Sequence, residues 1–248
     1  MFCMIIHRKE SMKTIDNIFD RMDRWRHLPS YQLERRADLY FALYLSEVLK
    51  RYLGISIKAD IIPEFPIRIA TISDGADGDK SYKADYLALS ENSRTAILVE
   101  LKTEMHSLND KQKEYLMAAR DVPFCMLLEG IKQIFRATTL KRKYYYLLEH
   151  LENLGQLTIP QKMKSIIARP VLQGIAKETD NIEITKREIE TIIVFIQPDL
   201  DPKKENPGKT ITFEQFRSVV EEYTDPISQR FACSLKEWVD VKAGCKIM

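Results

Sequence analysis

The sequence predicts an α/β fold with a mixed central sheet flanked by helices. Helical periodicity near the N-terminus is followed by short segments with strand alternation. Helical patterns then lie before and after one more apolar segment, Ile192 to Gln197. The 248 residues suffice for one large domain, and 45% hydrophobic with 30% charged residues is typical of a globular protein. No break in composition marks a boundary, so we expect a single domain over residues 1–248.

Two helices are predicted first. Met12 to His27 places Ile18, Phe19 and Met22 near one face, and Pro29 ends this helix. Tyr31 to Leu53 follows, with Ser30 as a plausible N-cap and Gly54 as its stop. The expected buried stripe of the second helix is Leu33, Ala37, Tyr40, Phe41, Tyr44 and Val48.

Extended segments come next. Ile55 to Ile62 and Phe65 to Ile72 are predicted strands, broken by Pro63 and Pro66. A Gly/Asp turn at Ser73 to Lys80 leads into a predicted hairpin. Its strands are Tyr82 to Leu89 and Thr95 to Lys102, and its tight turn is Glu91 to Arg94.

The second half alternates between helices and strands. Leu108 to Arg120 is a predicted helix capped near Ser107 or Asn109, and a mostly helical stretch, 124–166, is expected as an insertion or cap. Val122 to Leu128 is an alternative position for a fourth strand. The remaining expectations are strands at Arg169 to Ala176 and Ile192 to Gln197 (the latter central), a loop at Asp199 to Lys209, and helices at Phe213 to Tyr223 and Ser228 to Val241.

Composition excludes several classes of protein. The four cysteines form no C-x-x-C pair, the four histidines complete no zinc spacing, and no segment has the roughly 18 apolar residues of a membrane span. Nucleotide-binding glycine loops and the G-x-S-x-G elbow are also absent. We therefore expect a cytoplasmic protein with reduced thiols and no membrane partner.

The predicted hairpin places chemically active side chains together. Alternation puts Glu100 and Lys102 on one face of the second strand, and the short turn brings Asp85 of the first strand level with Glu100. The second strand is apolar on both faces up to Val99, so a buried acid and lysine would need a partner or a cation. Two neighbouring carboxylates favour a hard cation such as Mg²⁺ (or Mn²⁺), which suits phosphodiester hydrolysis.

This pattern resembles the D-x(n)-E-x-K signature of the PD-(D/E)XK nuclease superfamily. Asp85 is followed by Glu100-Leu101-Lys102, the only E-x-K in the chain, with Ala84 where the founding pattern has Pro. The resemblance implies a restriction-endonuclease-like core at 31–120, after a helical arm at 1–28, with the helical insertion at 124–166 and the remaining strands and closing helices at 167–248. It also implies a metal-dependent nuclease acting on nucleic acid, with DNA expected, and a homodimer as a frequent arrangement.

Auxiliary residues follow from the same resemblance. Asp85 and Glu100 would bind metal, and Lys102 would assist the attacking water. Gln112 and Tyr115 lie on the helix after the motif, where many members carry a Gln and a Tyr. Glu34 on an early helix, or Glu64 on the first strand, would be a further acid.

A basic and aromatic run, Lys141 to Tyr146, is a second candidate. Lys141, Arg142 and Lys143 could contact nucleic-acid phosphates, and tyrosines could stack on bases. Residues 105–170 carry 11 basic and 6 acidic side chains, so this part of the chain is locally positive. The alternative is a helix whose Leu140, Tyr144, Leu147 and Leu148 form a buried stripe.

Three functional readings stay open. The first is a nuclease. The second is the same fold with an impaired site, acting as a nucleic-acid- or protein-binding module. The third is an interaction protein in which Asp85, Glu100 and Lys102 are a structural salt-bridge cluster.

Overall fold

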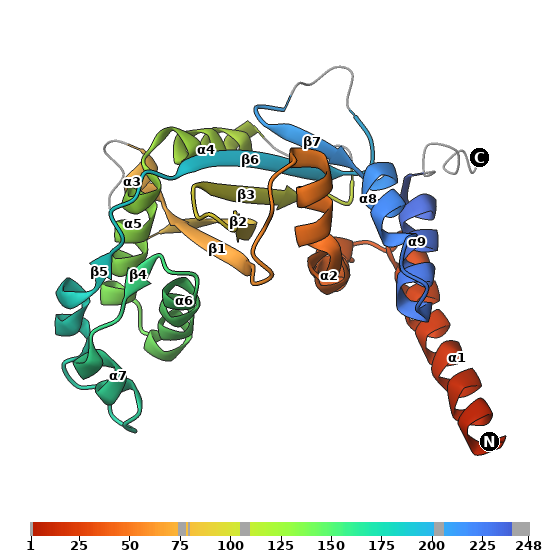
Figure 1. The fold of residues 1–248 in the computed structure, drawn as a ribbon, viewed down its shortest axis with the longest axis horizontal. Helices are drawn as coiled ribbons and strands as arrows, with labels where there is room; N and C mark the ends of the chain where they lie inside the picture. Colours follow the sequence, from red (N-terminus) through yellow and green to blue (C-terminus); the bar gives the residue numbers. More distant parts are fainter. Residues whose placement is uncertain (1, 74–77, 79, 105–109, 201–205, 240–248) are drawn as a thin grey trace. The chain divides into compact units, whose positions relative to one another are not determined.

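The structure, a computed structural model, describes residues 2–73, 78, 80–104, 110–200 and 206–239. Its main sheet has the hydrogen-bonded order β1-β2-β3-β6-β7 (Figure 1). Antiparallel pairing joins β1 (Ile62–Arg68), β2 (Ser81–Leu89) and β3 (Thr95–Leu101). β6 (Glu190–Gln197) runs parallel to β3, since Glu190 N donates to Arg94 O and Lys102 N donates to Ile196 O. The predicted α/β class with a mixed sheet is confirmed.

The chain divides into two compact units. The first unit holds residues 1–55, 101–108 and 195–248, and the second holds 56–100 and 109–194. Both boundaries in the sheet fall inside strands, after Glu100 in β3 and after Val194 in β6.

Aromatic side chains build the core of the first unit. Its helices are α1 (Phe2–Trp25), α2 (Leu33–Leu53), α8 (Phe213–Val220) and α9 (Pro226–Val239), and β7 (Lys209–Thr212) precedes α8. The Phe41 ring of α2 lies 5.3 Å from that of Phe213, 5.0 Å from that of Phe216 and 5.3 Å from that of Phe231. All four rings are fully buried, so α2, α8 and α9 share one apolar core.

The second unit adds helices to β1, β2 and β3. They are α3 (Ile69–Ile72), α4 (Asp110–Asp121), α5 (Phe124–Ala137), α6 (Lys141–Asn153), α7 (Gln161–Ile167) and the 3₁₀ helix η1 (Ile175–Asn181). A small antiparallel sheet pairs β4 (Leu157–Thr158) with β5 (Glu183–Ile184). Gly130 lets α5 lie close to α3, since a Cβ at Gly130 would stand 2.6 Å from the Oγ1 atom of Thr71 in α3.

Several predicted elements are confirmed. α2 ends at Gly54 in the left-handed conformation, and the hairpin β2–β3, the helices α4, α8 and α9, and the internal strand β6 lie close to their expected bounds. The helical stretch after Pro123 is also found. Most of the predicted turn Ser73 to Lys80, and the caps Ser107 and Asn109, lie outside the described residues.

The predicted bounds in the N-terminal third were wrong at three points. α1 begins at Phe2 rather than Met12, because the charged residues before Met12 are themselves good helix formers. Ile55 to Ile61 is not a strand and makes only an isolated bridge, Ile57 to Ser90. β1 instead runs through Pro63 and Pro66, which an edge strand tolerates, and Ile69 to Ile72 is helical.

Two further strand predictions were wrong. Phe124 to Leu128 belongs to α5, so Val122 to Leu128 is not a strand. Arg169 to Ala176 is a turn that leads into η1 through Gly174, with φ of +82°. Arg142 donates to the backbone carbonyls of Ile167 and Arg169. In a sheet, the backbone of a neighbouring strand would satisfy such carbonyls, whereas here a side chain does so. The short strands β4, β5 and β7 were not predicted.

No helix in the described part of the chain has the length and apolarity needed to cross a membrane.

Candidate active site

Asp85 and Glu100 lie on the paired strands β2 and β3. The register pairs Leu87 with Leu98 and Tyr86 with Val99, and Asp85 and Glu100 are the next residues along the two strands. Directly opposed residues project from the same face of a sheet, with Cβ atoms about 5 Å apart. Continued by one step, this register would set the two carboxylates on one face, which is the arrangement that the sequence predicts.

Glu100 is an acid in an apolar strand. Ala96 to Val99 are fully buried, and Glu100 itself is only 2% exposed, whereas Asp85 is half-buried. The hydroxyl of Tyr82 donates to Glu100 Oε2 at 2.6 Å, a short bond typical of a charged acceptor. This bond offsets part of the cost of burying the carboxylate.

Sequence reasoning did not single out Tyr82. Strict alternation places Tyr82 and Asp85 on opposite faces of β2. The strand pattern therefore gave no signal that Tyr82 would bond to the carboxylate of Glu100. Its only sequence signal is its position at the start of the strand that carries Asp85.

Helix α4 packs over this end of the hairpin. The rings of Tyr82 and Tyr115 lie 5.7 Å apart, and Lys111 Nζ lies 5.7 Å from the centre of the Tyr115 ring. Gln112 is one turn before Tyr115 and therefore on the same side of α4. Both are half-buried, so the two predicted auxiliary residues share the helix face that meets β2.

Lys102 and Glu34 come together in the first unit. Lys102 is 5% exposed, and its Nζ lies 3.8 Å from Glu34 Oε2 in the first turn of α2. Glu34 Oε1 also accepts from the backbone N of Thr103 at 3.4 Å. Glu34 thus interacts with the segment that directly follows β3. In the chain, only Leu101 separates Lys102 from Glu100.

Glu64 has an unusual backbone. It lies between Pro63, which pairs with Tyr86, and Phe65, which pairs with Ala84, and is therefore level with Asp85. Its φ is +52°, a conformation that costs a non-glycine residue energy. Its carboxylate binds Lys83 Nζ at 2.7 Å, and both side chains are more than half exposed.

The basic run contacts protein carbonyls. Lys141 Nζ donates to Phe135 O at 2.6 Å and to Arg136 O at 2.7 Å, at the end of α5. Arg142 donates to Ile167 O at 2.7 Å and Arg169 O at 2.6 Å. Lys143 is exposed. The buried side of α6 is Tyr145, Leu148 and Leu151, rather than the expected stripe with Leu140, which is 54% exposed.

The donor set suits a cation that binds few protein ligands. Among the described residues, no three His, Cys, Asp or Glu side chains gather as a metal cluster. Mg²⁺ commonly uses one or two carboxylates and keeps water or substrate oxygens in its remaining positions. Such a site would need no more from the protein than the carboxylates of Asp85 and Glu100, which are too few for a closed structural metal site.

Comparison with known protein families gave no match, and searches of characterised proteins and of solved structures gave none either.

Proposed function

We propose that this protein is a metal-dependent nuclease that hydrolyses phosphodiester bonds, with DNA as the expected substrate and Mg²⁺ or Mn²⁺ as the expected cation. The observation that carries the proposal is the register of β2 and β3, which pairs the strands up to Tyr86 and Val99, the residues next to Asp85 and the buried Glu100. The resemblance of Asp85 and Glu100-Leu101-Lys102 to the PD-(D/E)XK signature supports it. A cytoplasmic location and a homodimer remain predictions.

Each residue has a chemical role in this proposal. Asp85 and Glu100 would hold the cation, which when bound polarises the scissile phosphate and acidifies a water. Tyr82, through its hydrogen bond, would fix the orientation of the Glu100 carboxylate. Lys102 would orient the attacking water or stabilise the charge that develops on the phosphate, with Glu34 holding its ammonium.

The second candidate is a binding module with the same fold. It is favoured by one observation: among the described residues, no three His, Cys, Asp or Glu side chains gather as a possible metal site. In that case Asp85 and Glu100 would retain their geometry without supporting hydrolysis.

Cleavage assays with a lysine variant separate these functions. Purified protein would be incubated with single-stranded, double-stranded and branched DNA, in Mg²⁺, Mn²⁺ or EDTA, beside Lys102→Ala. We expect metal-dependent cleavage that Lys102→Ala reduces by about 100-fold or more. Lys186→Ala, which removes an exposed lysine, is the matched control and should cleave normally.

Metal binding is measured separately from cleavage. Mg²⁺ should raise the melting temperature of the protein, and Glu100→Gln should abolish that rise while preserving the shape of the carboxylate. Metal binding without cleavage of any substrate would favour the binding module. The nuclease proposal would be overturned if the protein cleaved no substrate and Mg²⁺ left its melting temperature unchanged.

A further inference from the structure

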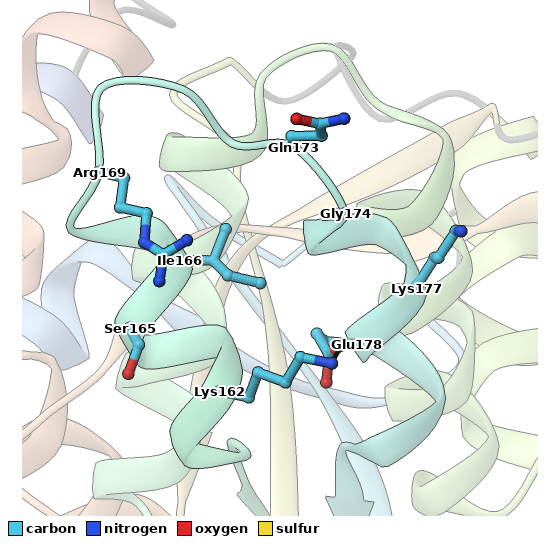
Figure 2. A pocket seen from close by; sticks show the side chains of 8 residues that line it. All are labelled: Lys162, Ser165, Ile166, Arg169, Gln173, Gly174, Lys177 and Glu178. Atoms are coloured by element: carbon cyan, nitrogen blue, oxygen red, sulfur yellow. Dashed lines mark ion pairs between the residues drawn. The ribbon is translucent and has the colours of Figure 1, made fainter.

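A cavity of about 490 Å³ lies in the second unit between α7 and η1, remote in sequence from Asp85 and Glu100. Its volume lies within the range of small-molecule binding sites and exceeds the volume that a phosphate ion alone would fill. Figure 2 shows its lining, with Lys162, Ser165, Ile166 and Arg169 on the α7 side and Gln173, Gly174, Lys177 and Glu178 on the η1 side. The cavity could therefore hold a ligand the size of a nucleotide.

The lining carries an excess of positive charge. Lys162, Arg169 and Lys177 are cationic, and Glu178 is the one acidic side chain among the lining residues. Glu178 is 5% exposed, and both of its oxygens are used: Lys162 Nζ lies 2.6 Å from Oε1, and Asn181 Nδ2 donates to Oε2 at 3.0 Å. Glu178 is thereby neutralised, which leaves two cations for a ligand.

No group in the described part of the chain engages these two cations. Arg169 and Lys177 are exposed, and within the described residues their side chains make no hydrogen bond or ion pair. In Figure 2 the Arg169 guanidinium lies beside Ile166, while Lys177 stands at the η1 rim and Gln173 on the loop above. Gln173 offers an amide donor that is likewise without a partner in this part of the structure.

The wall of the cavity is held in place by other side chains. Arg142 donates to the carbonyls of Ile167, Arg169 and Pro170, and so fixes the turn that carries Arg169. Lys132 is buried and donates to Ile182 O at 3.0 Å, just after η1. A rim that is already ordered lowers the entropic cost of binding.

We infer that this cavity binds a phosphate group, with Arg169 and Lys177 as its cationic contacts and Gln173 as a neutral donor. Guanidinium and ammonium groups form the strongest protein hydrogen bonds to phosphate. The phosphate could belong to a nucleic-acid strand or to a free nucleotide. The inference goes beyond the proposed nuclease, since none of these residues belongs to the carboxylate site.

Binding is tested on the full chain in EDTA, so that the result does not depend on cleavage. Inorganic phosphate and adenosine 5′-monophosphate would be titrated by calorimetry, and a short single-stranded DNA by fluorescence anisotropy. Arg169→Ala/Lys177→Ala should weaken binding by about 100-fold, about tenfold for each lost charged contact. The matched control, Lys186→Ala/Arg187→Ala, removes one lysine and one arginine that are exposed and outside this cavity.

Each result has a defined meaning. Binding of adenosine monophosphate that only the cavity variant loses supports the site and identifies a free nucleotide as sufficient. Binding of DNA alone, with the same selective loss, supports the site and identifies a backbone phosphate. For DNA, the dependence of log affinity on log salt should also become shallower by roughly 1.4 in the cavity variant. No binding of any probe, or an equal loss in both double variants, overturns the inference.

Discussion

At the scale of single residues, the bond from Tyr82 to Glu100 decides how a carboxylate persists inside an apolar strand. Glu100 is 2% exposed, and the 2.6 Å bond gives Oε2 a donor in place of water. A buried charge that loses a partner keeps its desolvation cost without compensation. Tyr82 is therefore a positioning residue for Glu100, and removing its hydroxyl should measurably lower the free energy of unfolding.

Tyr82→Phe should lower the free energy of unfolding by about 1–3 kcal/mol, because it removes the donor and leaves the buried carboxylate in place. The measurement is urea denaturation in EDTA. Tyr115→Phe removes a hydroxyl from the ring that packs on Tyr82, and should change stability by less than about 0.5 kcal/mol.

A double-mutant cycle identifies the partner. In Glu100→Gln protein, Tyr82→Phe should cost less than in the parent, because an amide oxygen is a weaker acceptor than a carboxylate. An equal cost in both backgrounds would show that the Tyr82 hydroxyl stabilises the protein through another contact.

The predictability of the site differs between its residues. Alternation and the short turn between the strands predict Asp85 opposite Glu100, and the structure confirms the pairing of these strands up to Tyr86 and Val99. The bond from Tyr82 depends on the local geometry at the strand end, which a two-residue period does not describe. The approach of Glu34 to Lys102 joins residues far apart in the chain, and only the resemblance indicated Glu34.

At the scale of elements, the junction of α6, α7 and η1 depends on side chains that bond to backbone carbonyls. Arg142 reaches from α6 to the last turn of α7 and to the turn beyond it. Cations stabilise helix C-termini, where carbonyls lack partners. Arg142 therefore replaces the pairing that a strand at Arg169 to Ala176 would have supplied.

Arg142→Ala should lower stability by about 1 kcal/mol, since bonds of a charged donor to three carbonyls are lost from a largely exposed site. Its neighbour Lys143 is exposed on the same helix, so Lys143→Ala should change stability by less than about 0.5 kcal/mol. Thermal unfolding of both variants measures the difference. Equal, small effects would show that the bonds from Arg142 do not stabilise this junction.

Elements with strong periodicity were predictable, and those set by tertiary partners were not. α2 and the β2–β3 hairpin carry clear apolar patterns and end signals. The bounds of β1 were predicted only in part, because prolines within a strand are compatible only with an edge, and strand order is not visible in sequence. The two-residue strands β4 and β5 are too short for any period to reveal.

At the scale of the whole molecule, carboxylates with lowered pKa values occur in both units. Hydrogen bonds from Lys162 lower the pKa of Glu178 in the second unit, and those from Ser228 lower the pKa of Asp225 in the first. For Glu152, burial alone would raise the pKa, but the bonds from Lys164 and from the backbone of Ile159 outweigh it and the pKa is lowered. Because each pKa lies below its unfolded value, each group stabilises the fold above that value, and the contribution is lost as pH falls through the folded pKa. We expect the stability of both units to decrease in acid.

Glu152 gives the sharpest test of this expectation. Its side chain is 19% exposed, and it accepts from Lys164 Nζ at 2.6 Å and from Ile159 N at 2.7 Å. Glu152→Gln should lower the free energy of unfolding by about 1–3 kcal/mol at neutral pH, since an amide does not match the ammonium of Lys164. Near pH 3, roughly a unit below the ordinary glutamate pKa, the difference between variant and parent should shrink, because the carboxylate of the unfolded parent takes up a proton before that of the folded parent does. Urea denaturation at both pH values measures this, with the exposed Glu188→Gln as control. A difference that stays constant with pH would mean that Glu152 stabilises the second unit through shape and packing, and that its charge contributes nothing to acid sensitivity.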